Sequence, residues 1–244
     1  MILEAQGLGK RFGGLKAVDN VDLKLHEHEI LGVIGPNGAG KTTLFSMIAG
    51  SVRPTTGQVL LDAKVISRLP AHRAVHAGVV RTHQIVRPFL GLSVLENVMV
   101  GAVYGKIGAR HARDRAMELL VFCKLDARAA DLPAQLTLAG RKRLELARAL
   151  ATQPRVLLLD EVIAGVNPVE AVQMAELIRE VRKQRGLSII MIEHVMPAVM
   201  SLSDRVIVLD AGKKIAEGLP KEVVRDPAVI AAYLGESAAK EQAR

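Results

Sequence analysis

The segment GPNGAGKT at residues 35–42 constrains the fold of this chain more than any other stretch. It fits the pattern G-x-x-x-x-G-K-[ST], and it lies between an apolar run, ILGVI at 30–34, and a helical run, TLFSMIAG at 43–50. In such a strand–loop–helix unit, successive backbone N–H groups and the positive end of the helix point toward phosphate oxygens. A chance glycine-rich turn would not need both flanks, so the sequence predicts a nucleotide-binding loop.

Two side chains of this loop carry specific chemistry. Lys41 is predicted to reach the β- and γ-phosphates, and the hydroxyl of Thr42 is predicted to hold Mg²⁺. The other residues of the loop and its helix that we expect to contact the nucleotide are Gly35, Pro36, Asn37, Gly38, Ala39, Gly40 and Thr43.

Short apolar runs alternate with helical patterns along most of the chain. Unbroken apolar strands that alternate with helices predict a parallel sheet covered on both faces. Because 50% of the residues are hydrophobic and only 2% are aromatic, the core is expected to be aliphatic. The predicted strands are ILGVIG at 30–35, QVLLD at 58–62, GVVRT at 78–82, RVLLLD at 155–160, LSIIMIE at 187–193 and RVIVLD at 205–210.

Two regions depart from this alternation. The segment VDLKLHEHE at 21–29 alternates apolar and polar residues, which predicts an antiparallel strand with one wet face. Residues 88–152 show helical patterns and no convincing strand, which predicts an inserted helical lobe. We therefore expect a single domain over 1–244, in which 1–87 and 153–244 form the nucleotide-binding core.

Local signals mark several boundaries. A capping box at Ser93–Glu96 and the pair Asn167-Pro168 each predict the start of a helix, and the polar tail at 236–244 is expected to fray. The single cysteine, Cys123, is predicted to be a small buried hydrophobe. No run approaches the ~18 apolar residues that cross a bilayer, so we expect a chain that is soluble or held at a membrane by partners.

Polar side chains follow three of the predicted strands, where ligands of open α/β sheets bind. Asp160 and Glu161 follow RVLLL; we expect Asp160 to hold Mg²⁺ and Glu161 to act as a general base. His194 follows LSIIMIE and is predicted to contact the γ-phosphate, although a lone histidine there is often structural. Gln84 follows GVVRT, and the residues alone leave open whether it touches Mg²⁺ and the attacking water.

Together these motifs resemble the ATP-binding subunit of an ABC transporter over nearly the whole chain. Phe12 lies 29 positions before Lys41, where that family places an aromatic ring that stacks on adenine. The resemblance implies a P-loop NTPase (RecA-like) α/β fold with an N-terminal antiparallel β subdomain and an inserted helical subdomain, and it implies hydrolysis of ATP with Mg²⁺. The matching motifs are Walker A at 35–42, the Q-loop residue Gln84, a signature at 136–140, Walker B at 156–160 with the catalytic Glu161, a D-loop at 164–167 and the switch residue His194.

In detail the chain is similar to the branched-chain amino-acid uptake group, chiefly through AGVNP at 164–168 and AYLGE at 232–236. That resemblance implies a homodimer, or a heterodimer with a second ABC ATPase, bound to two integral-membrane permease subunits and served by a periplasmic binding protein. It places the chain at the cytoplasmic face of the inner membrane. The alternatives are the ATPase of another ABC system, such as lipopolysaccharide export, and a soluble non-transport ABC ATPase.

The basic segment LTLAGRKRLELARAL at 136–150 has three possible interpretations: a nucleic-acid-binding helix, an ordinary solvated helix, or an altered signature motif. It lacks interleaved aromatics and a second basic element, so we predict no nucleic-acid partner despite the net charge of +8. The family resemblance places Leu136 and Thr137 at the first two positions of L-S-G-G-Q, with Leu138, Ala139 and Gly140 replacing G-G-Q.

This altered signature is expected to work across a subunit interface. Thr137 and the backbone of Ala139 and Gly140 would donate to the γ-phosphate of ATP bound by the opposite subunit. Arg141, Glu145 and Arg148 are spaced i, i+4 and i+7, which predicts one solvated and self-paired face.

Overall fold

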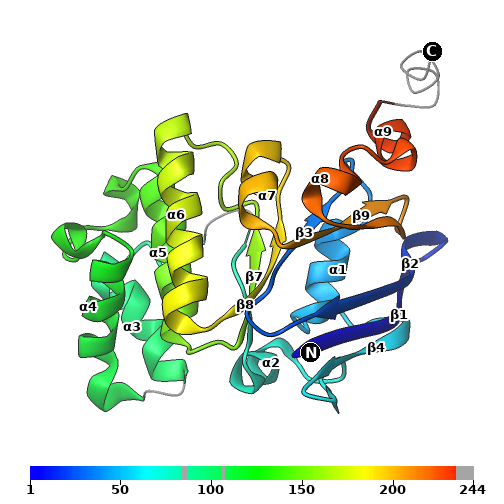
Figure 1. Cartoon of the computed structure of the whole chain (residues 1–244). Coiled ribbons are helices and arrows are strands. Elements are labelled where there is room, and N and C mark those ends of the chain that lie inside the picture. The colour runs from blue at the N-terminus through cyan, green and yellow to red at the C-terminus, as the bar shows by residue number, and fades with distance from the viewer. Residues whose placement is uncertain (84–86, 106–107, 235–244) are drawn as a thin grey trace.

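The computed structural model describes residues 1–83, 87–105 and 108–234 (Figure 1). The helical elements are α1 (Lys41–Ile48), α2 (Ala71–Ala77), α3 (Val94–Tyr104), α4 (Ala112–Phe122), α5 (Leu138–Ala151), α6 (Pro168–Arg185), α7 (Met196–Leu202), α8 (Pro220–Val223) and α9 (Pro227–Leu234). Short 3₁₀ turns lie at Ala109–His111, Asp126–Arg128 and Pro133–Gln135. None of the described helices combines the length and the apolar content needed to cross a bilayer.

A six-stranded sheet forms the centre of the molecule, in the order β10-β9-β3-β8-β7-β6. All neighbouring strands in it are parallel except the edge strand β10, which runs antiparallel to β9. The predicted parallel sheet is therefore confirmed for five of the six apolar runs. Its strands are β3 (Ile30–Ile34), β6 (Val79–Arg81), β7 (Val156–Asp160), β8 (Ser188–Ile192), β9 (Arg205–Asp210) and β10 (Lys213–Gly218).

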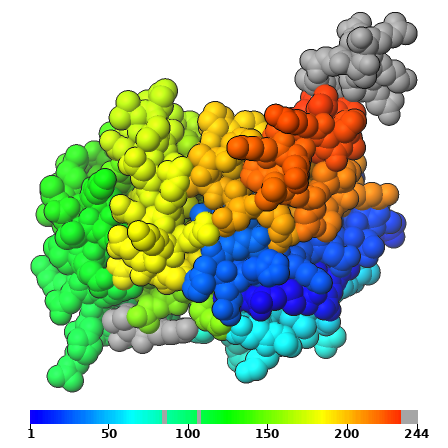
Figure 2. Space-filling view, in the orientation of Figure 1, coloured from blue at the N-terminus to red at the C-terminus, as the bar shows by residue number. Residues whose placement is uncertain are grey.

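The faces of this sheet belong to two different cores, which explains its unbroken apolar strands. In β7, Leu157 and Leu159 pack in a core shared with α3, α4, α5 and α6, whereas Val156 and Leu158 pack in a core shared with α1 and the antiparallel strands. Because side chains alternate across a strand, every residue of a strand covered on both sides must be apolar. The view in Figure 2 shows the helices around α4 at one end of the molecule and the N-terminal strands at the other.

The prediction that the sixth run, at 58–62, joins the parallel sheet is wrong. It forms β4 (Thr56–Leu61), which pairs antiparallel with β1 (Leu3–Phe12) in a second sheet of order β2-β1-β4-β5. Val59 and Leu61 are buried while Leu60 is only partly covered, so β4 has one buried face. Three consecutive apolar residues cannot distinguish such a strand from one buried on both faces. The remaining strands of this sheet are β2 (Leu15–Leu25) and β5 (Lys64–Val65).

The predicted antiparallel strand at 21–29 is confirmed only in its first part. The strand β2 pairs antiparallel with β1 but ends at Leu25, and the next residues form a turn in which His28 has φ 58°. The carboxylate of Glu29 accepts a hydrogen bond from the backbone N–H of His26 at 2.7 Å and is itself paired with Arg205. The alternation HEHE therefore reflects a capped turn and not a wet strand face.

The described residues of 88–152 form helices and 3₁₀ turns, and no strand. The helices α3, α4 and α5 pack around fully buried leucines such as Leu119 and Leu120. Cys123 is buried among them, as predicted, and burial raises the pKa of its thiol to about 12.

Two of the predicted helix starts are confirmed. Ser93 and Glu96 form a reciprocal capping box before α3. Asn167 caps α6 by accepting from the Glu170 N–H, and Pro168 is the first residue of that helix. The tail at 236–244 lies outside the described residues.

The contact between α3 and α5 gives a prediction about stability. A Cβ at Gly101 in α3 would lie 2.4 Å from the carbonyl oxygen of Arg148 in α5. Gly101→Ala should therefore push the two helices apart and lower the free energy of unfolding by ~1–3 kcal/mol, as overpacking typically does. Urea denaturation measures this, with Gly91→Ala as the control, because a Cβ at Gly91 would meet nothing within 4 Å. Equal midpoints for the two variants would contradict the close approach.

Candidate nucleotide-binding site

The loop between β3 and α1 packs too closely for side chains at two of its glycines. Gly35 has φ 147°, and a Cβ there would lie 2.0 Å from the carbonyl oxygen of Leu209 in β9. Gly40 has φ 97°, and a Cβ there would lie 2.3 Å from the carbonyl oxygen of Ala17 in β2. Only glycine fits both positions, so the tertiary packing of the loop requires these two glycines of the motif.

Lys41 opens α1 and folds its side chain back over this loop. Its Nζ donates hydrogen bonds to the carbonyl oxygens of Gly35, at 2.6 Å, and Pro36, at 2.9 Å. Burial lowers the pKa of this amine, and the carboxylates of Glu161 and Asp160 act in the opposite direction. The cation and the two acids therefore share one electrostatic environment at the carboxyl edge of the sheet.

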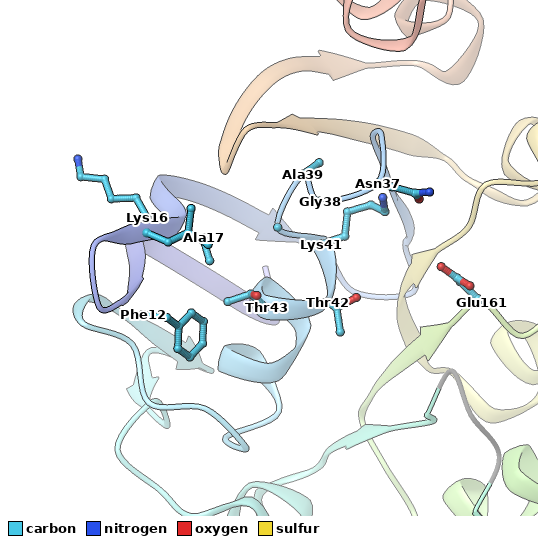
Figure 3. Close-up of a pocket in the computed structure, with 12 residues that line it drawn as sticks. Phe12, Lys16, Ala17, Asn37, Gly38, Ala39, Lys41, Thr42, Thr43 and Glu161 are labelled. Atoms are coloured by element: carbon cyan, nitrogen blue, oxygen red, sulfur yellow. The ribbon is translucent and has the colours of Figure 1, made fainter.

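A cavity of about 440 Å³ lies over the loop (Figure 3). Phe12, at the end of β1, and Glu161, after β7, lie at opposite ends of the close-up, with Lys41 and Thr42 between them. Phe12 is 50% exposed, with Nζ of Lys10 lying 5.1 Å from its ring centroid, and an exposed aromatic ring can stack on a planar ligand. The lining residues are Phe12, Leu15, Lys16, Ala17, Asn37, Gly38, Ala39, Gly40, Lys41, Thr42, Thr43 and Glu161.

Asp160 ends β7 with a carboxylate that is only 1% exposed. Its Oδ2 accepts a hydrogen bond from Arg81 at 2.6 Å, and Arg81 also donates to Oγ of Ser46 at 2.8 Å. Its Oδ1 is buried and has no hydrogen-bond partner among the described residues. A carboxylate oxygen of this kind suits a hard cation such as Mg²⁺, so Asp160 fits the metal predicted here; Thr42, the other ligand predicted from the loop, lies at the start of α1 and lines the cavity.

Glu161 and His194 follow the adjacent strands β7 and β8, and the structure brings them together. Nδ1 of His194 lies 3.6 Å from Oε1 of Glu161. The side chain of Glu161 is 20% exposed and that of His194 is 56% exposed, so water can reach both. A carboxylate that lines the cavity beside an imidazole can accept a proton from an attacking water molecule.

The altered signature lies at the start of α5 and does not line this cavity. Thr137 is the N-cap of α5, and its Oγ1 accepts a hydrogen bond from the Gly140 N–H at 3.1 Å. Ala139, in the first turn of α5, is only 3% exposed in the single chain. A nucleotide contact from these residues would therefore have to be made to a nucleotide bound by another chain.

The predicted solvated face of α5 is wrong. Arg141 is exposed, but Glu145 is only 5% exposed, and its carboxylate accepts a hydrogen bond from the His83 N–H at 2.6 Å. Arg148 donates to the carbonyl oxygen of Arg87 at 3.0 Å. Helical spacing places these side chains together but cannot reveal that another segment packs on them, which buries Glu145 and raises its pKa.

Gln84, the predicted ligand of Mg²⁺ and water, lies outside the described residues. The segment that leads to it is described. Thr82 is 1% exposed, and its Oγ1 accepts a hydrogen bond from the backbone N–H of Asp160 at 3.2 Å. The chain immediately before Gln84 is thus attached to the strand that carries the expected metal ligand.

Sequence reasoning missed two cations beside the site: Lys142, which is buried, and Arg81, whose side chain is 11% exposed. Nothing in the sequence indicates that Arg81 is covered, because an arginine at the end of a short strand is usually solvated. The spacing of Lys142 does indicate burial, because this residue lies three positions after Ala139 and four before Leu146, on the buried face of α5. Its Nζ donates to the carbonyl oxygens of Glu161, at 2.7 Å, and Ala164, at 2.5 Å.

Comparison with known proteins agrees with this geometry. The family model described as "ABC transporter" matches residues 18–164, and the model described as "Branched-chain amino acid ATP-binding cassette transporter" matches residues 213–239. The chain is 41% identical to the high-affinity branched-chain amino acid transport ATP-binding protein LivG of Salmonella typhimurium, over 97% of this chain and 98% of that protein. It is 36% identical to the lipopolysaccharide export system ATP-binding protein LptB of Haemophilus influenzae, over 96% and 98% respectively.

A solved structure leads to the same family. The ADP conformation of an ATP-binding cassette of an ABC transporter superposes with a TM-score of 0.88 at 32% identity, covering 96% of this chain and 99% of that one. The predicted fold class is confirmed, and so is the resemblance drawn from the order of the motifs. The chain belongs to the ABC transporter family, as one of its ATP-hydrolysing, ATP-binding cassettes.

Proposed function

We propose that this chain binds and hydrolyses ATP to energise an importer of branched-chain amino acids or related small polar solutes. The observation that carries the catalytic part is the pairing of Glu161 with His194, 3.6 Å apart, beside the cavity that contains Lys41. The importer assignment is supported by the match of residues 213–239 to the branched-chain amino acid cassette model and by the 41% identity to LivG.

In this proposal the loop at 35–42 cradles the phosphates and Phe12 stacks on the adenine. Lys41 exchanges its two carbonyl partners for phosphate oxygens, which are stronger acceptors because they are charged. Glu161 accepts the proton of the attacking water, and His194 contacts the γ-phosphate from the neighbouring strand. Bound Mg²⁺ would neutralise charge on the phosphates, with Thr42, Asp160 and Gln84 as its protein ligands.

The helices α3–α5 would act as a helical subdomain over 88–152, set against a core made of 1–87 and 153–244. We propose that two such chains, or this chain and a second ABC ATPase, enclose two ATP molecules head to tail. The start of α5 would then meet the nucleotide of the opposite chain. The pair would be bound to two integral-membrane permease subunits at the cytoplasmic face of the inner membrane, with a periplasmic binding protein supplying the solute.

Thr137 gives a test of the contact across the interface. Thr137→Ala removes a hydrogen bond to a charged group, typically worth ~1.5–3 kcal/mol, so turnover in the assembled complex should fall about tenfold or more. ATP binding by the isolated chain should be spared. Because Oγ1 also caps α5, the substitution should separately lower the free energy of unfolding of the isolated chain by ~0.5–2 kcal/mol. Steady-state ATPase assays and urea denaturation measure the two effects separately.

Thr137→Ser is the matched control, since it keeps a hydroxyl for both roles. It should behave as the unmutated chain in both assays. If Thr137→Ala lowers stability but leaves turnover in the complex unchanged, the residue is only a helix cap, and the proposed contact with the opposite nucleotide is wrong.

The transported solute is tested in cells. We expect deletion of the gene in its source organism to abolish high-affinity uptake of radiolabelled leucine, isoleucine and valine. The unmutated gene should restore uptake, and a gene encoding Lys41→Ala should not. Normal uptake after deletion, combined with defective lipopolysaccharide export, would instead favour the second candidate function, which the 36% identity to LptB supports.

A further inference from the structure

Lys142 is a buried cation that lies outside the nucleotide cavity. It projects from the first turns of α5, is only 6% exposed, and its Nζ donates to the carbonyl oxygens of Glu161 and Ala164 at 2.7 and 2.5 Å. An ammonium group is seldom buried unless its donors are used. Here both recorded hydrogen bonds go to the loop that follows β7, which includes the proposed catalytic base.

The backbone of Glu161 has an unusual conformation that needs such support. Its φ is 51°, in the left-handed region, which costs free energy for any residue with a Cβ and persists only when the surroundings impose it. The N–H of Glu161 donates to the Ile192 carbonyl oxygen at 2.9 Å, and its C=O accepts from Lys142. Both sides of the residue are therefore held, one by β8 and the other by α5.

Other charges around the loop favour a cation at this position. The carboxylate of Glu193 is 1% exposed and accepts a hydrogen bond from the Ile163 N–H at 2.8 Å. Burial lowers the pKa of Lys142, and the carboxylates of Glu193, Glu161 and Glu145 act in the opposite direction. Because these carboxylates favour the charged ammonium, a neutral side chain of the same length would leave the carbonyl oxygens of Glu161 and Ala164 without their donor.

We propose that Lys142 is a positioning residue, which fixes the backbone of Glu161 and so makes hydrolysis depend on the placement of α5. The inference rests on the proposed role of Glu161 as the base. Thr137, at the start of the same helix, is the residue proposed to contact the opposite nucleotide. When the start of α5 contacts that nucleotide, the helix shifts as one rigid body. Lys142 moves with it and carries the shift to the carbonyl oxygen of Glu161. Each site would thereby be aligned by the nucleotide bound at the other.

Lys142→Met tests the proposal, because methionine keeps much of the apolar stem and removes the charge and the donors. We expect kcat for ATP hydrolysis to fall ~10–100-fold, as displacements of about 1 Å in catalytic groups typically cause, while KM and the ATP affinity of the isolated chain change little. Arg143→Met is the control on the same helix: its guanidinium donates to Gln173 of α6 and not to the loop. Its kcat should be unchanged.

A double-mutant cycle shows whether Lys142 acts through Glu161. In the Glu161→Gln background the base is already absent, so adding Lys142→Met should cause no further loss of residual turnover. Losses that multiply would mean that Lys142 acts elsewhere, which overturns the proposal. If the single variant Glu161→Gln hydrolyses ATP normally, the proposed function fails instead, so the two failures are distinguishable.

Hydrogen exchange gives a readout that does not depend on activity. Lys142→Met should speed exchange of the amides at 161–166, and Arg143→Met should not. Lys142→Arg keeps a charged donor and should recover at least part of kcat and of the protection. If Lys142→Met does not fold, Lys142→Gln replaces it in the same assays. Unchanged kcat and exchange in the folded Lys142→Met or Lys142→Gln variant would overturn the proposal.

Discussion

Lys41→Ala should abolish ATP turnover and weaken ATP binding more than any other single substitution in the chain. The ammonium is proposed to meet both the β- and γ-phosphates, and each hydrogen bond to a charged group is typically worth ~1.5–3 kcal/mol. Losing two such contacts corresponds to a reduction in affinity of about 10²- to 10⁴-fold. The present partners of Lys41, the carbonyls of Gly35 and Pro36, belong to the loop itself, so the ammonium is already held beside the expected phosphate position.

Isothermal titration calorimetry and phosphate release from the purified chain measure these two quantities. Lys64→Ala is a matched control, because it removes the same charge from an exposed residue of β5 in the antiparallel sheet. It should bind and hydrolyse ATP as the unmutated chain does. Full ATPase activity in a highly purified Lys41→Ala sample would show that the loop at 35–42 is not the catalytic phosphate site.

Glu161→Gln should separate ATP binding from hydrolysis. The amide keeps the shape of the carboxylate but cannot accept the proton of the attacking water, and loss of general base catalysis typically costs 10²–10⁴-fold in rate. Binding should persist, because the loop and Lys41 are unchanged. With hydrolysis blocked, the closed dimer should accumulate, and light scattering after size-exclusion chromatography with ATP and Mg²⁺ should report twice the mass of one chain.

Glu176→Gln makes the same chemical change at an exposed position of α6. That control should hydrolyse ATP normally and should not accumulate as a dimer. Retention of wild-type turnover by Glu161→Gln would remove Glu161 from the role of base. A variant that binds ATP but stays monomeric, even with its membrane partners, would count against the enclosed pair of nucleotides.

The parts of the fold that follow from local sequence could be predicted. The loop at 35–42 needs glycines at fixed positions, and α3 and α6 begin at side-chain caps. Each of these features depends on a few residues that are adjacent in the sequence. Five parallel strands could be identified because each is covered on both faces and is therefore apolar throughout. The prediction for the run at 58–62 is wrong because its three consecutive apolar residues do not reveal that one face of β4 is only partly covered.

The parts of the site that depend on tertiary contacts could not be predicted. Arg81 and Asp160 form an ion pair between neighbouring strands, and Glu145 is buried because the segment at His83 packs onto α5. In the sequence Arg81 and Glu145 look like ordinary surface charges, and the motif that identifies Asp160 does not reveal its arginine partner. Only the helical spacing of Lys142 relative to its apolar neighbours indicated burial, and it gave no hint that the ammonium reaches the backbone of Glu161.

The enclosed pair of nucleotides is tested most directly by a structure of the Glu161→Gln variant with ATP and Mg²⁺. We predict two chains related head to tail, with each γ-phosphate lying between the loop at 35–42 of one chain and the residues Thr137–Gly140 of the other. Lys142 should still contact the backbone of residue 161, and Phe12 should lie against the adenine. A nucleotide bound by a single chain, or a dimer in which the start of α5 faces away from the phosphates, would contradict the proposal.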